Sequence, residues 1–118
     1  MKQNNTLQHG EFQDVNVQLR LLNMTDSLPI KYTAATPKQR RQVREQYVHE
    51  QGGLCYWCNE PLTGDAPKYI TEKKVNWKLF PPGFLKNPIH LQHDHSSDLT
   101  EGAVHAICNA IMWQYHGR

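Results

Sequence analysis

The sequence predicts one small domain of the α+β class, in which a helix, a β-hairpin and a second helix follow one another. Its 118 residues suffice for a single domain with a modest core. Good helix formers fill residues 36–51, residues 89–95 and 103–104 fit two paired strands, and a helical segment follows at 108–116. Only 38% of the residues are hydrophobic and the mean hydropathy is −0.73. We therefore expect the fold to need a brace beyond its core, either a disulfide or a metal ion.

The first helix has clear start and stop signals. Thr36 supplies a hydroxyl for the N-cap position, and Pro37 is suited to the first helical position. The Gly52-Gly53 pair is typical of a helix end. The sequence therefore predicts a helix from residue 36 to residue 51.

The segments outside this helix are less regular. Residues 1–35 are predicted to form a polar N-terminal extension, with a strand where Val15, Val17, Leu19 and Leu21 alternate with polar residues. Five prolines between residues 61 and 88 predict a long loop-rich insertion with short extended pieces near 69–70 and 75–79. A turn is expected at 96–102, between the two strands of the hairpin.

Four cysteine and histidine residues have the spacing of a metal site. Cys55 and Cys58 form a CxxC pair, and His105 and Cys108 repeat the same spacing. Three sulfurs and one imidazole complete a tetrahedral zinc site with no open position, which is typical of structural zinc. The alternatives are a redox-active CxxC pair, or a buried Cys108 beside a structural His105. An odd count of three cysteines argues against a disulfide framework.

The chain has no segment suited to a membrane. No apolar run approaches the roughly 20 residues that span a bilayer, and the N-terminal MKQNNTLQHG lacks the apolar stretch of a secretory signal. We therefore expect an intracellular, cytoplasmic protein without a membrane partner.

Basic residues gather in two clusters, although the net charge is only +2. One cluster lies on the predicted helix and the other in the proline-rich insertion. Such clusters favour a polyanion as the partner, and a solvated surface is the alternative. The expected phosphate contacts are Lys38, Arg40, Arg41, Arg44, Lys73 and Lys74.

A second group of chemically active residues lies in the predicted hairpin. On a strand, His93 and His95 share one side, while His90, Gln92 and Asp94 share the other. A neutral imidazole can accept a proton near pH 7, and a carboxylate or amide oxygen can hold a hard divalent cation. The alternatives are an exposed polar hairpin or an adventitious metal site.

Three motifs in order carry a resemblance to a known family. They are Gln51-Gly-Gly-Leu-Cys55-Tyr-Trp-Cys58, then His93-Asp94-His95, then Gly102-Ala-Val-His105-Ala-Ile-Cys108-Asn109. Together they resemble the HNH or His-Me finger endonucleases, and look most like the phage-encoded branch that includes recombination endonuclease VII. The resemblance covers residues 36–116 and implies a ββα-metal fold, in which a hairpin and a helix grip a catalytic metal and a structural zinc braces them. Residues 36–118 are then the nuclease domain.

The resemblance also implies roles for single residues. His93 matches the general base, and Asn109 matches the amide that helps to hold a catalytic Mg²⁺ or Mn²⁺ ion. His105 stands where the branch usually has a cysteine. Gln92 stands where the family has its metal-binding aspartate, so the ion would be held by Asn109 with Gln92 or Asp94. In a shifted register Asp94 and His95 become the working pair. With His93 as the base, Asp94 and His95 stay candidates for metal ligands or phosphate contacts.

The implied activity is metal-dependent hydrolysis of DNA, by nicking or cutting double strands. The resemblance places such an enzyme in a phage or mobile element, and hence in the cytoplasm of a host cell. A close variant is a resolvase of branched DNA (Holliday junctions). Paired cutting often needs a homodimer, although no residue marks a dimer surface. The alternative is a non-catalytic zinc module that binds nucleic acid or protein, with Gln92 as the sign of lost chemistry.

Overall fold

The computed structural model describes residues 27–117, so the strand predicted near residues 14–21 lies outside the described part of the chain. The described elements confirm a small mixed α+β domain with one two-stranded antiparallel sheet. Within residues 27–117 we find no helix with the length and apolar character needed to cross a bilayer. The elements are α2 (Pro37–Glu50), α3 (Lys68–Thr71), the 3-10 turn η1 (Trp77–Leu79), β1 (Ile89–His93), β2 (Thr100–His105) and α4 (Ala106–His116).

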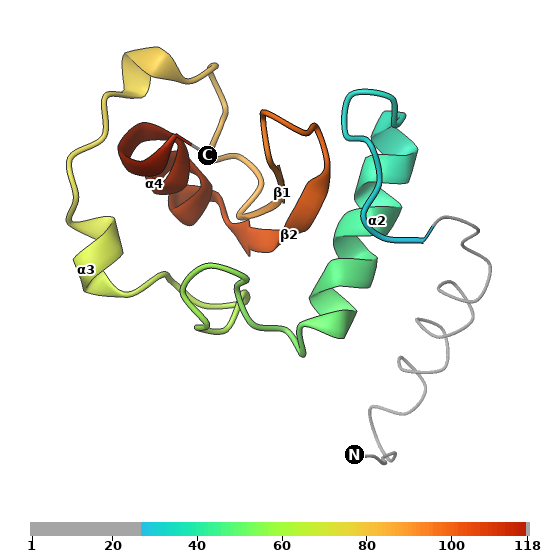
Figure 1. The fold of residues 1–118 in the computed structure, drawn as a ribbon. Coiled ribbons are helices and arrows are strands. Elements are labelled where there is room, and N and C mark those ends of the chain that lie inside the picture. The colour runs from blue at the N-terminus through green and yellow to red at the C-terminus, as the bar shows by residue number, and fades with distance from the viewer. Residues whose placement is uncertain (1–26, 118) are drawn as a thin grey trace, which may run out of the picture.

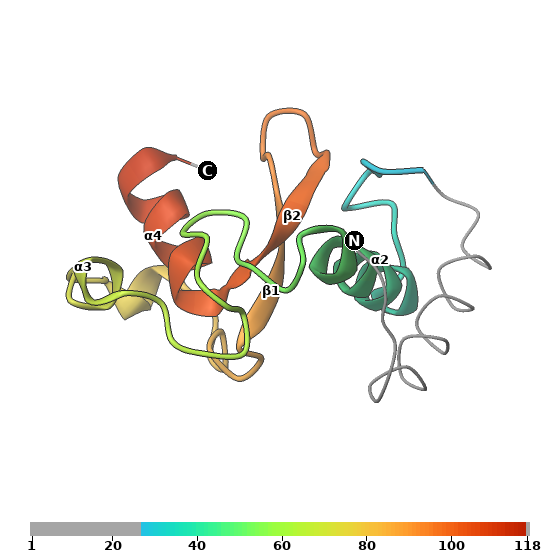
Figure 2. The ribbon, with the colours of Figure 1, turned by 90° about the horizontal axis from the view of Figure 1, so that it is seen from below.

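The β1–β2 hairpin lies between the two long helices (Figure 1). Helix α2 packs on one side of it and α4 follows directly from β2 on the other side, as the second view also shows (Figure 2). The long segment between α2 and β1 passes the hairpin and then runs around α4. This arrangement puts the end of α2, the hairpin and the start of α4 next to one another.

Helix α2 begins and ends as its sequence predicts. The Thr36 hydroxyl accepts a hydrogen bond from the Gln39 amide at 3.1 Å, and the Gln39 side chain accepts one from the Thr36 amide at 2.8 Å. At the other end, Gly52 and Gly53 both adopt positive φ angles, +65° and +79°, which glycine tolerates best.

The core joins all three main elements. Val43 and Tyr47 of α2 are buried against the hairpin. The Tyr47 hydroxyl also lies 3.0 Å from the Thr100 hydroxyl, so one polar contact fixes α2 to the start of β2. The remaining buried apolar residues come from the hairpin, from α4 and from the loops: Leu62, Ala66, Ile70, Leu91, Ala103, Val104, Ile111 and Met112.

The hairpin differs in its limits from the prediction. Strand β2 begins at Thr100, within the predicted turn, because Thr100 pairs with His93 of β1, and a distant segment also bonds to it. The Ile30 amide donates to the Thr100 hydroxyl, and the Thr100 amide donates to the Ile30 carbonyl, both at 3.0 Å. The turn is therefore shorter, and Asp94 closes it by accepting a hydrogen bond from the Ser96 amide. The predicted extension of the first strand to residue 95 is wrong, because β1 ends at His93 and residues 95–97 form the turn.

The two extended pieces predicted in the insertion differ from the structure, since residues 69–70 lie in α3 and residues 77–79 form η1. A short helix starts after Pro67, and the Asn76 side chain caps a 3-10 turn by accepting from the Lys78 amide. The Asn76 cap outweighs the strand preference of Trp77. Helix α4 likewise starts at Ala106, two residues before the predicted start, because His105 takes the extended N-cap position.

Gln51 and Gly102 form the junction between α2, the cysteine turn and β2. The Gln51 amide nitrogen donates to the carbonyls of Leu54 (2.7 Å) and Ala103 (2.9 Å), and its oxygen accepts from the Ala103 amide (2.8 Å). A Cβ on Gly102 would lie 2.7 Å from Cγ of Tyr56 and 2.8 Å from the Gln51 oxygen. Only glycine therefore fits at residue 102.

We expect Gly102→Ala to destabilise the domain by about 2 kcal/mol, because the added methyl group forces Tyr56 and Gln51 apart. Urea denaturation monitored by circular dichroism measures this change. Gly64→Ala is the matched control, since its Cβ would meet nothing closer than 3.8 Å. Equal stabilities for the two variants would contradict the close packing at Gly102.

Candidate functional site

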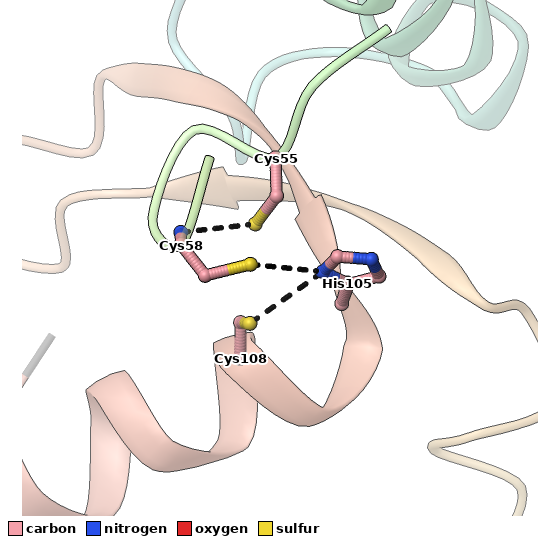
Figure 3. A group of neighbouring side chains, drawn as sticks. All are labelled: Cys55, Cys58, His105 and Cys108. Carbon is pink, nitrogen blue, oxygen red and sulfur yellow. Dashed lines mark hydrogen bonds between the residues drawn. The ribbon is translucent and has the colours of Figure 1, made fainter. Parts of the chain in front are cut away.

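Four side chains from three parts of the fold meet at one point. Cys55 and Cys58 lie in the turn after α2, His105 ends β2, and Cys108 lies in the first turn of α4 (Figure 3). Their ligand atoms all lie within 4.8 Å of one another. The structure thus confirms that the four residues predicted from the spacing lie close enough to hold one metal ion.

The cysteine turn has a backbone suited to metal binding. The Cys55 sulfur accepts hydrogen bonds from the amides of Trp57 (3.4 Å) and Cys58 (3.5 Å). The chain then reverses through Asn59, which has a positive φ of 64°, and the Cys55 amide donates to the Glu60 carbonyl. Asparagine tolerates this left-handed conformation better than most residues. The turn therefore holds both sulfurs on the same side before any ion binds.

The histidine of this cluster is held in one tautomer. Nε2 of His105 lies 2.9 Å from the Pro61 carbonyl oxygen, which can only accept, so Nε2 carries the proton. Nδ1 is then a free lone pair, and it lies 3.4 Å from the Cys58 sulfur and 3.7 Å from the Cys108 sulfur. A ligating histidine whose other nitrogen donates to a backbone carbonyl is the usual arrangement in metal sites.

Hydrogen bonds and burial shift the pKa values of the three thiols in this cluster. A hydrogen bond from the Cys108 thiol lowers the pKa of Cys55 to about 4. The same hydrogen bond raises the pKa of Cys108, and burial raises the pKa of Cys58. Metal binding would release these protons, because thiolates are the ligands. The donor set of three sulfurs and one nitrogen is consistent with structural zinc.

A groove of about 850 Å³ lies between α2, β1 and α4. Arg40, Arg41 and Arg44 line it from α2. Its lining from the hairpin and α4 includes four polar side chains: His90, His93, His95 and Asn109. The groove thus brings together the predicted base, the predicted amide ligand and three of the predicted phosphate contacts.

His93 is positioned by aromatic contacts. Its ring stacks on Tyr32, with centroids 3.9 Å apart and an interplanar angle of 7°, and meets the edge of His95 at 4.7 Å. The Arg40 guanidinium lies 3.9 Å from the Tyr32 centroid and donates to the Tyr32 carbonyl. Burial lowers the pKa of His93, and the neighbouring His95 lowers it further. A lowered pKa favours the neutral ring, which is the form that a general base needs.

His90 and Asn109 form a direct pair in the same groove. Nε2 of His90 lies 2.8 Å from the Phe84 carbonyl, so this nitrogen donates and Nδ1 keeps its lone pair. The Asn109 amide nitrogen lies 3.1 Å from this Nδ1. Burial lowers the pKa of His90, so the ring is neutral.

The other expected ligands of a catalytic ion are engaged elsewhere. Gln92 is only 1% exposed, and its amide nitrogen donates to the His93 carbonyl at 2.9 Å. Its oxygen is buried without a partner among the described residues. Asp94 closes the hairpin turn. Neither side chain lines the groove, so of the three expected ligands the structure places Asn109 alone there.

The basic residues predicted to contact phosphate lie in two places. The three arginines line the groove, and Lys38 is exposed on the first turn of α2. Lys73 and Lys74 lie in the insertion beside α4, where the Tyr115 hydroxyl donates to the Lys74 carbonyl. The Lys73 amine lies 5.1 Å from the Tyr115 ring. The insertion lysines therefore do not belong to the groove.

Sequence reasoning gave no role to Tyr32 or to His90. Tyr32 lies 61 positions before His93 and carried no local signal, because its position depends on the pairing of residues 30–33 with residues 98–100. His90 had a signal, since it is one of the clustered histidines, but only the structure shows its contact with Asn109.

Comparison with protein-family models, with curated proteins and with solved structures gives no match.

We expect the purified protein to hold one zinc ion and to lose it on Cys58→Ala or His105→Ala. Each variant should also lose most of its cooperative melting, because metal binding and folding are coupled in such sites. Elemental analysis and thermal denaturation measure both effects. His49→Ala, which removes an exposed histidine at the end of α2, should change neither. Full zinc retention and unchanged melting in Cys58→Ala would contradict the metal centre.

Proposed function

We propose that this chain is a metal-dependent DNA endonuclease of the HNH type, in which β1, β2 and α4 form a ββα-metal motif. The observation that supports this most is a single groove that contains the neutral His93, the Asn109 amide and a row of arginines. These groups supply a base, a metal ligand and phosphate contacts. The order of the three sequence motifs supports the same proposal.

His93 would act as the general base. It removes a proton from a water molecule, whose oxygen attacks the phosphorus of the scissile phosphodiester. The new phosphorus–oxygen bond forms as the bond to the leaving 3′ oxygen breaks, and that oxygen takes a proton from solvent. The stacking of His93 on Tyr32 limits its rotation, so the ring is held before substrate binds.

Asn109 would hold the catalytic ion through its amide oxygen. Its amide nitrogen contacts His90 in this structure, which leaves the oxygen as the atom that a cation would take. A divalent ion bound there, Mg²⁺ or Mn²⁺ by the resemblance, would supply positive charge opposite the phosphate and the leaving oxygen. Gln92 and Asp94 would have to leave their present hydrogen bonds to join it.

The substrate would be double-stranded DNA that is recognised mainly through its phosphates. Arginine suits this role because its planar guanidinium can bind a phosphate through two hydrogen bonds. A site with one base and one ion would cut one strand at a time, so a double-strand cut or the resolution of a branched junction would need two copies of the chain. The proposed source, a phage or mobile element, rests on the resemblance alone.

A non-catalytic zinc module that binds nucleic acid is the second candidate. One observation favours it: residue 92 is a buried glutamine instead of a metal-binding carboxylate. A binding module would still need the metal centre and the arginines of the groove. It would not need His93 to be a neutral base.

We expect the zinc-loaded protein to nick or linearise supercoiled plasmid in the presence of Mg²⁺ or Mn²⁺. His93→Ala should lower the rate at least about a hundredfold, because it removes the general base. Its zinc content and melting should stay close to wild type, since His93 lies outside the metal centre.

His49→Ala is the control, and it should cut like wild type. Equal cutting by wild type and His93→Ala would exclude His93 as the base and leave His95 as the candidate. Absence of cutting on plasmid and on a four-way junction, with DNA binding retained, would favour the binding module.

The rate of cutting should depend on pH through His93. A general base must be unprotonated, and a lowered pKa keeps His93 unprotonated to lower pH. We therefore expect kcat to be near its maximum at pH 7 and to fall only below about pH 6.5, where an unperturbed histidine titrates. A profile of plasmid nicking from pH 5 to pH 8 at constant ionic strength measures this. A rate that still rises tenfold per pH unit above pH 7 would contradict a base of lowered pKa.

A further inference from the structure

A side-chain contact in the groove joins His90 of β1 to Asn109 of α4. It links a strand residue to a helix residue 19 positions later, and both side chains line the groove. The role suggested for Asn109 makes its partner important, because a metal ion bound to the amide would lie beside the His90 ring.

His90 has the same internal arrangement as the histidine of the metal centre. In both rings Nε2 donates to a backbone carbonyl, at 2.8 Å for His90 and 2.9 Å for His105. In both rings Nδ1 keeps its lone pair and points into a group of potential ligands. The Phe84 ring meets the His90 ring edge-on at 4.6 Å, which further limits its rotation. His90 is therefore preorganised as a ligand in the way expected of metal-binding histidines.

The distance between the two side chains fits two ligands of one ion. Neighbouring ligands of an octahedral ion are about 3 Å apart when each metal–ligand bond is about 2.1 Å. The Asn109 amide nitrogen lies 3.1 Å from Nδ1 of His90. Rotation of the amide by a half turn would exchange its nitrogen for its oxygen, since the two have nearly the same shape. The oxygen and Nδ1 would then face each other as two lone pairs, an unfavourable contact that a cation relieves.

We propose that His90 and Asn109 together hold the divalent ion of the groove, and that this ion is a first-row transition metal in preference to Mg²⁺. The role of the ion rests on the proposed nuclease function, whereas the site itself can be tested by metal binding alone. The remaining coordination positions would be filled by water and by phosphate oxygens of the substrate.

The chemistry of the two ligands determines the preference. Mg²⁺ favours carboxylate, carbonyl and water oxygens, while imidazole suits later first-row metals such as Ni²⁺, and the affinity of a given site rises from Mn²⁺ through Co²⁺ to Ni²⁺. Neither ligand carries a negative charge, and the nearby Gln92 supplies none either. The site therefore lacks the carboxylate that would make Mg²⁺ competitive.

Binding of Mn²⁺ to the zinc-loaded full chain, followed by electron paramagnetic resonance, tests this site. Manganese is suited to the test because it competes poorly for the sulfur ligands of the zinc centre. We expect one Mn²⁺ site in wild type, and an affinity about tenfold or more lower in His90→Ala and Asn109→Ala. His49→Ala should bind like wild type, and an equal concentration of Mg²⁺ should displace little Mn²⁺. A wild type without this site, or a folded His90→Ala with unchanged affinity, would overturn the inference.

Asn109→Asp keeps the test valid if His90→Ala fails to fold. A carboxylate of the same size adds a charged, hard ligand, so we expect tighter Mn²⁺ binding and effective competition by Mg²⁺. Loss of structure cannot produce such a gain. Unchanged Mn²⁺ affinity and Mg²⁺ competition in a folded Asn109→Asp would overturn the inference.

Plasmid cutting by the same proteins separates this inference from the proposed function. Cutting that depends on His93 but is unchanged in His90→Ala, with Mg²⁺ as effective as Mn²⁺, would overturn the His90 site and leave the nuclease intact. A Mn²⁺ site that depends on His90, in a protein that cuts no DNA, would support the site and count against the nuclease.

Discussion

Cys58 and His105 are 47 positions apart in the sequence, yet their ligand atoms lie 3.4 Å from each other. An ion between them and their two neighbours would close a loop that contains the whole insertion and most of the hairpin. The core of the described residues is small, and the regular structure described within the insertion is limited to the short turns α3 and η1. A bond of this kind would therefore supply much of the order that the insertion lacks, in the manner of other small metal-dependent domains. Gln51 and Gly102 add a second connection at the same junction.

A metal bound by the Cys/His cluster would also help to fix where the groove residues lie. Asn109 directly follows Cys108 on α4, so a ligand bond to Cys108 fixes the position of the amide along the helix. His90 lies on β1 opposite Val104, next to His105 on β2. An ion held by these four residues would thus help to position both sides of the groove without touching it. The positions of Tyr32 and His93 in the groove depend instead on contacts outside the Cys/His cluster. Tyr32 packs on His93, and the Tyr47 hydroxyl of α2 contacts Thr100 of β2.

The sequence was informative wherever the physical cause is local. The cap at Thr36, the glycines after Gln51 and the repeated ligand spacing are short-range signals, and the structure confirms the helix and the four-residue cluster. The burial of Gln92 could not be predicted, because the strand register shifts between Gln92 and His93 and simple alternation of faces does not describe it. The early start of β2 likewise depends on pairing with residue 30, which no local pattern reveals. The roles of His93 and Asn109 as base and ligand stay predictions.

The burial of residue 92 and the chemistry of the groove are connected. Residue 92 is 1% exposed, and the hydrogen bond of its side chain goes to a backbone carbonyl and not to a cation. A carboxylate at this position would therefore carry a large desolvation cost, whereas a neutral amide carries a smaller one. If His90 and Asn109 hold the ion instead, all protein ligands in the groove are neutral. The negative charge that stabilises the ion must then come from the phosphate of the bound nucleic acid. Metal and DNA would consequently each strengthen the binding of the other, as linkage requires, and the arginines of α2 would attract the DNA before the ion completes the site.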